Sequence, residues 1–364
     1  EGHSFPTRRS SDLSMFVLLA FYFIAAFCEF FAPYDPQSRD VQHLSAPPMG
    51  IHFFDLEGDF HLRPFVYAYE QEVDEESWKR TYSIITEETN DEGETVEYPG
   101  GKRHPLTLFP KGDPYKLWNL IPMERHFFGA DGGPVYLLGT DRLGRGVLSR
   151  IFYGARISLT IGLVGVGMTF LLGILLGGLA GYFGGFVDNV VQRTIEVLMS
   201  IPQLPLWMAL SAALPAYWSP IQIYFGITII LSLLGWTGLA RVVRGKFLSL
   251  RDEDFVVAAQ LSGTSEIKII FRHLLPSFLS HVITAATLAV PAMILGETAL
   301  SFLGIGLRPP VISWGVLLQQ AQNYQTVAMA PWLLTPGLFV IVVVLAFNLM
   351  GDGLRDAADP YSSK

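Results

Sequence analysis

The residues best suited to do chemistry in the first third of the chain are histidines set among carboxylates. Residues 33–155 contain 20 acidic and 12 basic residues, whereas the rest of the 364-residue chain contains 13 of each. A histidine metal site needs a short ligand spacing such as His-x-x-x-His. The histidines of this segment lack such a spacing; they are His43, His52, His61, His104 and His126. We therefore expect solvated or packed histidines and no metal site.

No other pattern in the sequence specifies a reaction. We find no Ser–His–Asp or paired-carboxylate arrangement specific enough to propose catalytic residues, and we expect no cofactor on this chain. A Gly-x-x-x-x-Gly-Lys-Ser/Thr sequence is absent, so the chain has no P-loop of its own for ATP hydrolysis. The single cysteine, Cys28, excludes a disulfide framework and a Cys-rich metal site.

The composition points to a bilayer. Half of the residues are apolar, only 16% are charged and the mean hydropathy is +0.36, whereas soluble domains carry about 25% charged residues. The acidic segment also argues against nucleic acid as a partner.

Six stretches are long and apolar enough to cross a membrane, since a spanning helix needs roughly 20 mainly apolar residues. The first two lie at about residues 13–31 and 157–185. The third begins near residue 190 and the fourth ends near residue 240. The last two lie at about residues 277–300 and 332–350. Residues 197–240 contain no charge, and Pro215 with Pro220 marks a turn that divides them into two spans. The first stretch could be a signal peptide, but no small-residue cleavage site follows it, which favours an uncleaved anchor.

Basic residues set the orientation. The loop between the fourth and fifth spans contains Arg241, Arg244, Lys246, Arg251, Lys268 and Arg272. Because cytoplasmic loops are enriched in Lys and Arg, this loop and both termini should be cytoplasmic. The acidic segment then lies outside.

These spans divide the chain into consecutive parts. We expect a non-native or disordered N-terminus at 1–14, a first helix at 15–32, and an interfacial segment at 138–156. Between these two elements, alternating runs and turn sequences predict a small, partly β-structured extracytoplasmic insertion at 33–137. The remaining five helices form a core at 157–351, followed by a cytoplasmic tail at 352–364.

Several residues within the predicted spans allow more than one interpretation. Three polar residues could lie beside a translocation path or make structural hydrogen bonds, because polar and ionisable groups in a span should face protein or water. They are Glu297, Glu196 and Asn348. A stripe of glycines four residues apart permits close helix contact; its members are Gly173, Gly177, Gly181 and Gly185. The stripe could face a sister subunit or pack internally.

The basic loop contains a predicted helix–turn–helix elbow at residues 252–276. Asp254 can cap a first helix with apolar positions at Phe255, Ala258, Ala259 and Leu261. Gly263 ends it, Thr264 or Ser265 starts a second helix, and Pro276 precedes the fifth span. The spacing alone is equally consistent with an ordinary amphipathic connector.

The elbow carries a recognisable pattern, Ala258-Ala259-x-x-x-Gly263 followed by His273-x-x-Pro276. It resembles the cytoplasmic EAA loop of bacterial ABC importer permeases, with Val257 in place of the usual Glu. Further stretches resemble the C-type subunit of oligopeptide and dipeptide importers. They are Leu138-Gly-Thr-Asp-Arg-Leu-Gly-Arg (followed by Gly146, where an acid is usual), Tyr153-Gly-Ala-Arg-Ile-Ser-Leu159, Gly181-Tyr-Phe-Gly-Gly-Phe-Val-Asp188, Leu300-Ser-Phe-Leu-Gly-Ile-Gly306, Ser313-Trp314-Gly315 and Phe347-Asn-Leu-Met-Gly-Asp-Gly-Leu-Arg-Asp356.

This resemblance implies an all-α polytopic membrane protein with six transmembrane helices in the ABC type I importer permease fold, interrupted by the insertion. Residues 244–276 would be the cytoplasmic coupling loop that docks on an ATPase subunit. Its residues would be Phe255, Val257, Ala258, Ala259, Gly263, His273 and Pro276.

The resemblance also implies partners. These are a sister permease in a heterodimer, two ABC ATPase subunits that bind ATP and magnesium, an extracytoplasmic substrate-binding protein and membrane lipid. The chain would be a transport subunit of the bacterial inner membrane, not an enzyme, with peptides as cargo. Nickel complexes and antimicrobial peptides are alternative cargoes, and a membrane-anchored extracellular enzyme or sensor is the rival class. We expect the insertion at residues 33–137 to contact the binding protein or to cap the outer mouth of the translocation cavity.

Overall fold

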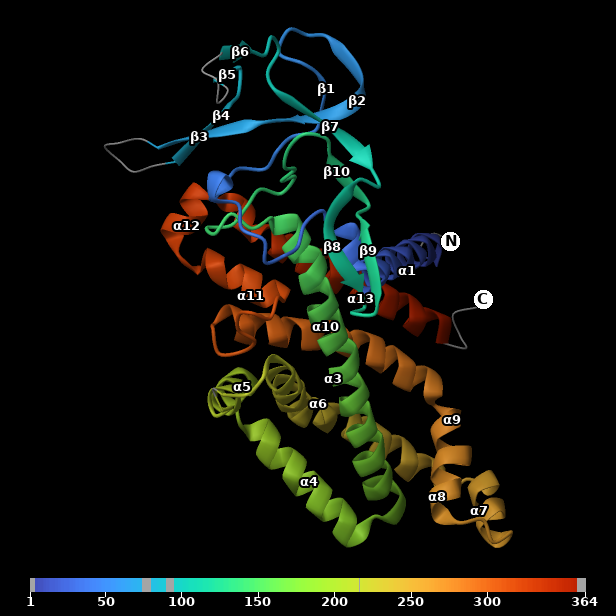
Figure 1. Cartoon of the computed structure of the whole chain (residues 1–364). Coiled ribbons are helices and arrows are strands. Elements are labelled where there is room, and N and C mark those ends of the chain that lie inside the picture. The colour runs from blue at the N-terminus through green and yellow to red at the C-terminus, as the bar shows by residue number, and fades with distance from the viewer. Residues whose placement is uncertain (1–3, 74–79, 90–94, 216, 359–364) are drawn as a thin grey trace. The chain divides into compact units, whose positions relative to one another are not determined.

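The computed structural model describes residues 4–73, 80–89, 95–215 and 217–358 (Figure 1). The chain forms two compact units. One contains residues 1–21, 157–311 and 339–364, and the other contains residues 22–156 and 312–338.

Within the described residues, four helical stretches are long and apolar enough to cross a membrane. They are α3 (Val147–Phe183), α6 (Pro220–Leu250), α10 (Leu279–Phe302) and Pro331–Ala357, which contains η4 (Pro331–Leu334) and most of α13 (Thr335–Ala358). The apolar part of α1 (Ser4–Ala26), from Ser10 to Ala26, is shorter. The predicted count of six spans is therefore not reached by length and composition.

The third predicted span is a bent pair of helices. α4 (Gly185–Ser200) and α5 (Gln203–Ala212) meet at 88°, and together they would count as a fifth span (Figure 1). The bend has a local cause. Ile201 has an extended backbone, as residues before proline prefer, and Pro202 cannot donate a helical hydrogen bond.

The turn predicted at Pro215 and Pro220 is present. Ser219 caps α6, its side chain accepting from the backbone N–H of Gln222, while the Gln222 side chain accepts from the backbone N–H of Ser219. Pro220 then occupies the first turn, where its missing N–H costs nothing.

Two helix starts differ from the predictions. α1 begins at Ser4, so residues 4–14 are helical where the sequence indicated a disordered or non-native end. α3 begins at Val147, so the last ten residues of the predicted interfacial segment at 138–156 belong to this long helix. The arginines that interrupt the apolar pattern there are paired, Arg150 with Asp141 and Arg156 with Glu29, which allows the helix to continue.

Short helices connect the longer ones. α2 (Cys28–Phe31) follows α1, and η1 (Val41–His43) precedes the strands. After α10 come α11 (Trp314–Gln319), η3 (Gln320–Gln322) and α12 (Tyr324–Met329).

The second unit contains ten short strands among its described residues, within the range predicted to be partly β-structured. Four form an antiparallel sheet in the order β1-β2-β7-β10, and the others form three hairpins: β3–β4, β5–β6 and β8–β9. The sheet strands are β1 (His52–Phe54), β2 (Phe60–Tyr67), β7 (Arg103–Leu108) and β10 (Phe128–Ala130). The hairpin strands are β3 (Tyr69–Val73), β4 (Arg80–Ile84), β5 (Glu87–Thr89), β6 (Thr95–Glu97), β8 (Lys111–Leu117) and β9 (Ile121–Arg125).

Candidate functional site: the elbow at residues 252–276

The first helix of the elbow, α7 (Asp254–Leu261), begins one residue earlier than predicted. Glu253 occupies the N-cap position with an extended backbone, and its side chain makes no capping hydrogen bond. Asp254 is therefore not the cap. It lies in the first turn, where its negative charge interacts favourably with the positive end of the helix dipole.

The turn between the two helices depends on Gly263, as predicted. Its N–H donates to the carbonyl of Gln260 at 3.0 Å, and the N–H of Thr264 donates to the carbonyl of Ala259 at 3.1 Å. This pair of bonds defines a Schellman motif. Gly263 has φ +75°, and a β-carbon there would meet open space. The residue type is thus required by the backbone conformation and not by crowding.

The second arm is made of three helical pieces. Ser265 is the N-cap of α8 (Glu266–Ile269), which continues into the wider π-helical turn η2 (Ile270–Leu274) and then α9 (Leu275–Ser277). His273 lies in η2, and Pro276 lies in the first turn of α9. Because Pro276 has no N–H to donate, a π-type turn before it is a ready accommodation.

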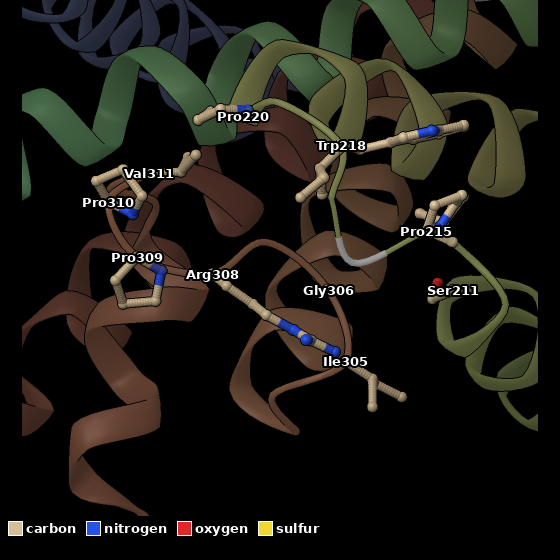
Figure 2. A pocket seen from close by; sticks show the side chains of 12 residues that line it. Ser211, Pro215, Trp218, Pro220, Ile305, Gly306, Arg308, Pro309, Pro310 and Val311 are labelled. Atoms are coloured by element: carbon tan, nitrogen blue, oxygen red, sulfur yellow. The ribbon is translucent and has the colours of Figure 1, made fainter.

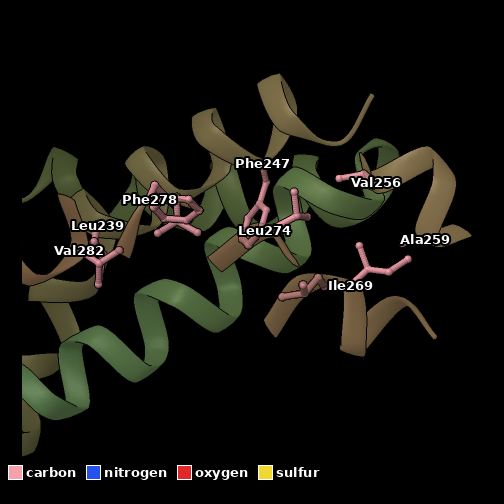
Figure 3. Packing of buried hydrophobic residues seen from close by; sticks show 10 residues of the cluster. Leu239, Phe247, Val256, Ala259, Ile269, Leu274, Phe278 and Val282 are labelled. Atoms are coloured by element: carbon pink, nitrogen blue, oxygen red, sulfur yellow. The ribbon is translucent and has the colours of Figure 1, made fainter. Parts of the chain in front are cut away.

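An apolar cluster fixes the inner face of the elbow. Val256 and Ala259 of α7 and Leu274 of η2 belong to one buried cluster with Phe247 of α6 (Figure 3). The ring of Phe247 meets that of Phe278 edge-on, with centroids 5.7 Å apart. The elbow is therefore packed onto α6 and the start of α10.

The outer face of α7 is apolar and exposed. Phe255, Val257 and Ala258 are exposed, and so is Gly263 at the turn. Ala259 is only 8% exposed, so it supports this surface from below and does not form it. Leu261, by contrast, is 84% exposed. It lies one turn after Val257 on the same face. The predicted docking residues did not include Leu261, although this spacing could have indicated it.

The arginines near the elbow have different partners. Arg244 of α6 pairs with Asp188 of α4, with Nη2 and Oδ2 2.5 Å apart. Arg251 lies 3.6 Å from Asp252, and Arg241 is exposed. Arg244 thus has an internal structural role.

Three of the four glycines predicted to form a stripe pack internally. A β-carbon at Gly173 would lie 2.8 Å from Leu239, and one at Gly181 would lie 2.7 Å from the carbonyl oxygen of Arg244. Gly177 lies against Ala240 between them. Gly185 is not part of this contact, because it starts α4 with φ +53° and faces open space.

Glu297, on α10, is fully buried. Its carboxylate accepts from the hydroxyl of Ser301 at 2.8 Å and from that of Ser158 on α3 at 3.3 Å. These bonds correspond to the structural alternative for this residue. Glu196 is exposed and pairs with Arg193 at 2.7 Å, and Asn348 is exposed on α13.

A small cavity of about 190 Å³ lies in the helical unit (Figure 2). Ser211, Pro215 and Trp218 line it from α5 and the loop after it, and Ile305 and Arg308 line it from the loop after α10. Ligand pockets are usually about 300–1,000 Å³ in volume, so we assign no cargo site to this cavity.

The loop at residues 138–145, one of the stretches that resemble the importer permeases, is organised by Asp141. Its Oδ1 accepts the N–H groups of Leu143 and Arg145 at 2.8 and 3.0 Å, and its Oδ2 accepts Nε of Arg145 at 2.8 Å. Burial by itself would raise the pKa of Asp141, but the arginine donors outweigh it and hold the pKa below its ordinary value. The motif is thus a charge-stabilised turn.

Three of the histidines of the insertion have simple partners. Nε2 of His61 lies 2.8 Å from Oδ2 of Asp55, which Arg103 also contacts at 2.6 Å. His43 contacts Asp40 at 2.8 Å, and Nδ1 of His126 lies 2.6 Å from the carbonyl oxygen of Ala32. Among the described residues, no three metal-ligating side chains come together.

Two family models match the chain. "Binding-protein-dependent transport system inner membrane component" matches residues 173–363, and "N-terminal TM domain of oligopeptide transport permease C" matches residues 9–48. The second match includes residues 9–14, within the segment predicted to be non-native or disordered.

Curated relatives cover most of the chain. The dipeptide transport system permease protein DppC of Bacillus subtilis is 39% identical over 66% of this chain and 71% of its own length. The oligopeptide transport system permease protein OppC of the same organism is 35% identical over 71% and 80%, and that of Haemophilus influenzae is 40% identical over 67% and 74%. Among solved structures, an inward-facing MetNI methionine ABC transporter chain matches 58% of this chain and 98% of its own, at 18% identity and a TM-score of 0.44.

Proposed function

The chain belongs to the family of binding-protein-dependent inner-membrane transport components, among the oligopeptide and dipeptide permease C subunits. From this membership we infer that it is the transmembrane permease subunit of an ATP-driven importer. It is not itself an enzyme, and it works in a bacterial inner membrane. The observation that carries this conclusion is 35–40% identity to named peptide permeases over about two thirds of the chain.

We propose peptides as the cargo. The relatives at this level of identity are named for dipeptides, oligopeptides or di- and tripeptides. The chain would form half of the pathway in the type I importer arrangement of six spans, α1 and the bent α4–α5 pair each being one span. A sister permease would supply the other half, and a substrate-binding protein would deliver peptide from outside.

The energy source would be two ATPase subunits, which bind ATP and magnesium. We propose that the exposed apolar face of α7 docks on one of them, through Phe255, Val257, Ala258 and Leu261. Closure of the ATPases would push α7. Because Val256 and Ala259 anchor α7 to α6 and η2, that push would tilt the spanning helices and open the translocation pathway to the outside. Hydrolysis would reset it inward.

The orientation follows from the basic elbow. With residues 241–272 in the cytoplasm, both termini are inside and residues 33–137 are outside. The insertion would then lie where the binding protein docks. Deleting residues 45–130 should reduce uptake while the membrane complex stays assembled, and unchanged uptake would remove this role.

The function is tested by reconstitution of the chain with its sister permease and ATPases in liposomes. We expect ATP- and binding-protein-dependent uptake of a radiolabelled dipeptide, which excess unlabelled peptide abolishes. Uptake of nickel complexes without peptide competition would assign the other cargo class. Peptide uptake without any ATPase subunit would contradict the assignment as part of an ATP-driven importer.

A further inference from the structure

One hairpin of the insertion is tied to the first helix of the chain. The side chain of Trp118, at the tip between β8 and β9, donates from Nε1 to the carbonyl oxygen of Ala26 at 2.7 Å. Its ring lies 5.1 Å from that of Phe27. The tip is therefore held at the end of α1, at the level of Ala26.

The tip is apolar and uncovered in spite of these contacts. Trp118 is 48% exposed, Leu120 77% and Ile121 50%. Neighbouring aromatic side chains extend the same surface along α1 and the hairpin; they are Phe23, Phe109 and Phe127, all exposed. The ring of Phe23 lies 4.9 Å from that of Phe27 and 5.8 Å from that of Phe31, and the ring of Phe31 lies 5.2 Å from that of Phe127 (centroid distances), so these side chains form one connected group.

The charge pattern sets this tip apart from the rest of the insertion. Residues 116–123 contain a single charged side chain, Lys116, and no acid, although residues 33–155 contain 20 acids. An apolar tip with a flanking cation is typical of a segment that meets a lipid headgroup layer.

The backbone at the tip also favours a role for the Trp118 ring. Trp118 and Asn119 have φ values of +50° and +62°. Glycine or asparagine adopts this left-handed conformation readily, but a bulky residue such as Trp rarely does. The turn would form more easily with glycine or asparagine at this position. The presence of tryptophan therefore indicates a role for its ring at the surface of the turn.

The position of the tip along α1 indicates whether it lies at the bilayer interface or in the hydrocarbon core. Ala26 precedes Phe31, the last helical residue of α2, by five residues, which corresponds to about 7.5 Å along a helix that rises about 1.5 Å per residue. At the same level Glu29 pairs with Arg156, whose guanidinium also reaches the carbonyl of Ala26. A charge pair beside apolar rings is the composition of a bilayer interface and not of its hydrocarbon centre.

We propose that the tip of the β8–β9 hairpin, residues 117–121, inserts into the outer lipid interface beside α1. Trp118, Leu120 and Ile121 contact the boundary between acyl chains and headgroups, where tryptophan is enriched in membrane proteins. The occupant of this surface is lipid, and the hairpin anchors the insertion on the membrane. The inference rests on the proposed function only in taking α1 as a span with its C-terminal end outside.

The test is site-directed spin labelling of the full chain, assembled with its partner subunits in lipid nanodiscs. Cys28 is replaced by Ala, and single cysteines are introduced as Leu120→Cys, Leu62→Cys and Phe16→Cys. Leu62 is the matched control, because it is 86% exposed on β2 of the same insertion, and Phe16 is an exposed position on α1 itself. Collision with oxygen reports lipid, and collision with a water-soluble nickel chelate reports water.

We expect the ratio of oxygen to nickel collision rates to be several-fold higher at residue 120 than at residue 62, and high at residue 16. A label at 120 that meets the nickel chelate as freely as the one at 62 would overturn the lipid contact, with the span confirmed by residue 16. Exclusion of both probes at 120 would also overturn it, in favour of a protein partner. If residue 16 reports water, the span itself fails, and with it both the proposed topology and this inference.

Discussion

Gly177 of α3 lies directly against the backbone of Ala240 in α6, where a β-carbon on residue 177 would stand 2.4 Å from the carbonyl oxygen of Ala240. Such a separation is shorter than any van der Waals contact, so the two helices could not keep their distance with a side chain at this position. The close approach of α3 and α6 is therefore set by the glycine, as small residues do in membrane helix pairs.

We expect Gly177→Val to destabilise the purified complex by about 1–3 kcal/mol, the usual range for overpacking, and so to lower its thermal midpoint. Gly167→Val is the matched control, because a β-carbon on that glycine of the same helix meets nothing within 4 Å. Equal midpoints for the two variants would show that α3 and α6 are not in this contact.

The ion pair of Arg244 with Asp188 joins α6 to the bent α4. Both side chains are partly exposed, so we expect Arg244→Met to cost about 1 kcal/mol or less in stability. The exchange of both charges, Asp188→Arg with Arg244→Asp, should recover most of that loss. Arg193→Met, which breaks an exposed pair within α4, should have almost no effect. A charge exchange that is worse than either single variant would argue against the pairing.

The buried hydrogen bonds of Glu297 predict a clear split between two substitutions. Glu297→Gln can accept from one of the two hydroxyls, Ser301 or Ser158, through its amide oxygen and donate to the other through its NH2 group, because a hydroxyl can also accept. We therefore expect it to retain peptide uptake and most of its stability. Glu297→Ala leaves both hydroxyls without this acceptor, which typically costs about 1–3 kcal/mol for buried groups. If Glu297→Gln abolishes uptake in a stably folded complex, the carboxylate acts in translocation and not in packing.

The insertion should lose stability in acid through Asp55. The hydrogen bond from His61, with further donors and the charge of Arg103, lowers the pKa of Asp55 from 3.8 to about 2. Its folded form therefore releases the proton more readily than the unfolded chain. The resulting stabilisation is present above pH 3.8 and is lost as the pH falls toward 2. Fluorescence-detected unfolding should show a smaller decline over this window in Asp55→Asn than in the wild type, and equal declines would contradict the assignment.

Local chemistry allowed some elements to be predicted. Gly263 as the end of α7 and the Pro220 turn before α6 follow from backbone rules that act over a few residues. The start of α3 at Val147 was missed, because Arg150 and Arg156 resemble a span boundary until their partners Asp141 and Glu29 are known.

The division of the elbow into an inner and an outer face also needed the structure. Ala258 and Ala259 are adjacent and alike in the sequence, but only Ala259 is buried in the cluster with Phe247. Likewise, no pattern in the sequence links Trp118 to Ala26, which are 92 residues apart. Contacts of this kind depend on tertiary packing and cannot be read from spacing.

The coupling role of the elbow is tested most directly by co-purification of the ATPase subunits with Gly263→Arg, alongside ATP-driven peptide uptake. The matched control is Gly58→Arg in the insertion, because both glycines have a positive φ and open space around the β-carbon position. Backbone strain is then similar in the two variants. We expect Gly263→Arg to lose the ATPases and uptake while it keeps the sister permease, and Gly58→Arg to keep all of them. Retention of the ATPases and full uptake by Gly263→Arg would contradict the assignment of this elbow as the docking site.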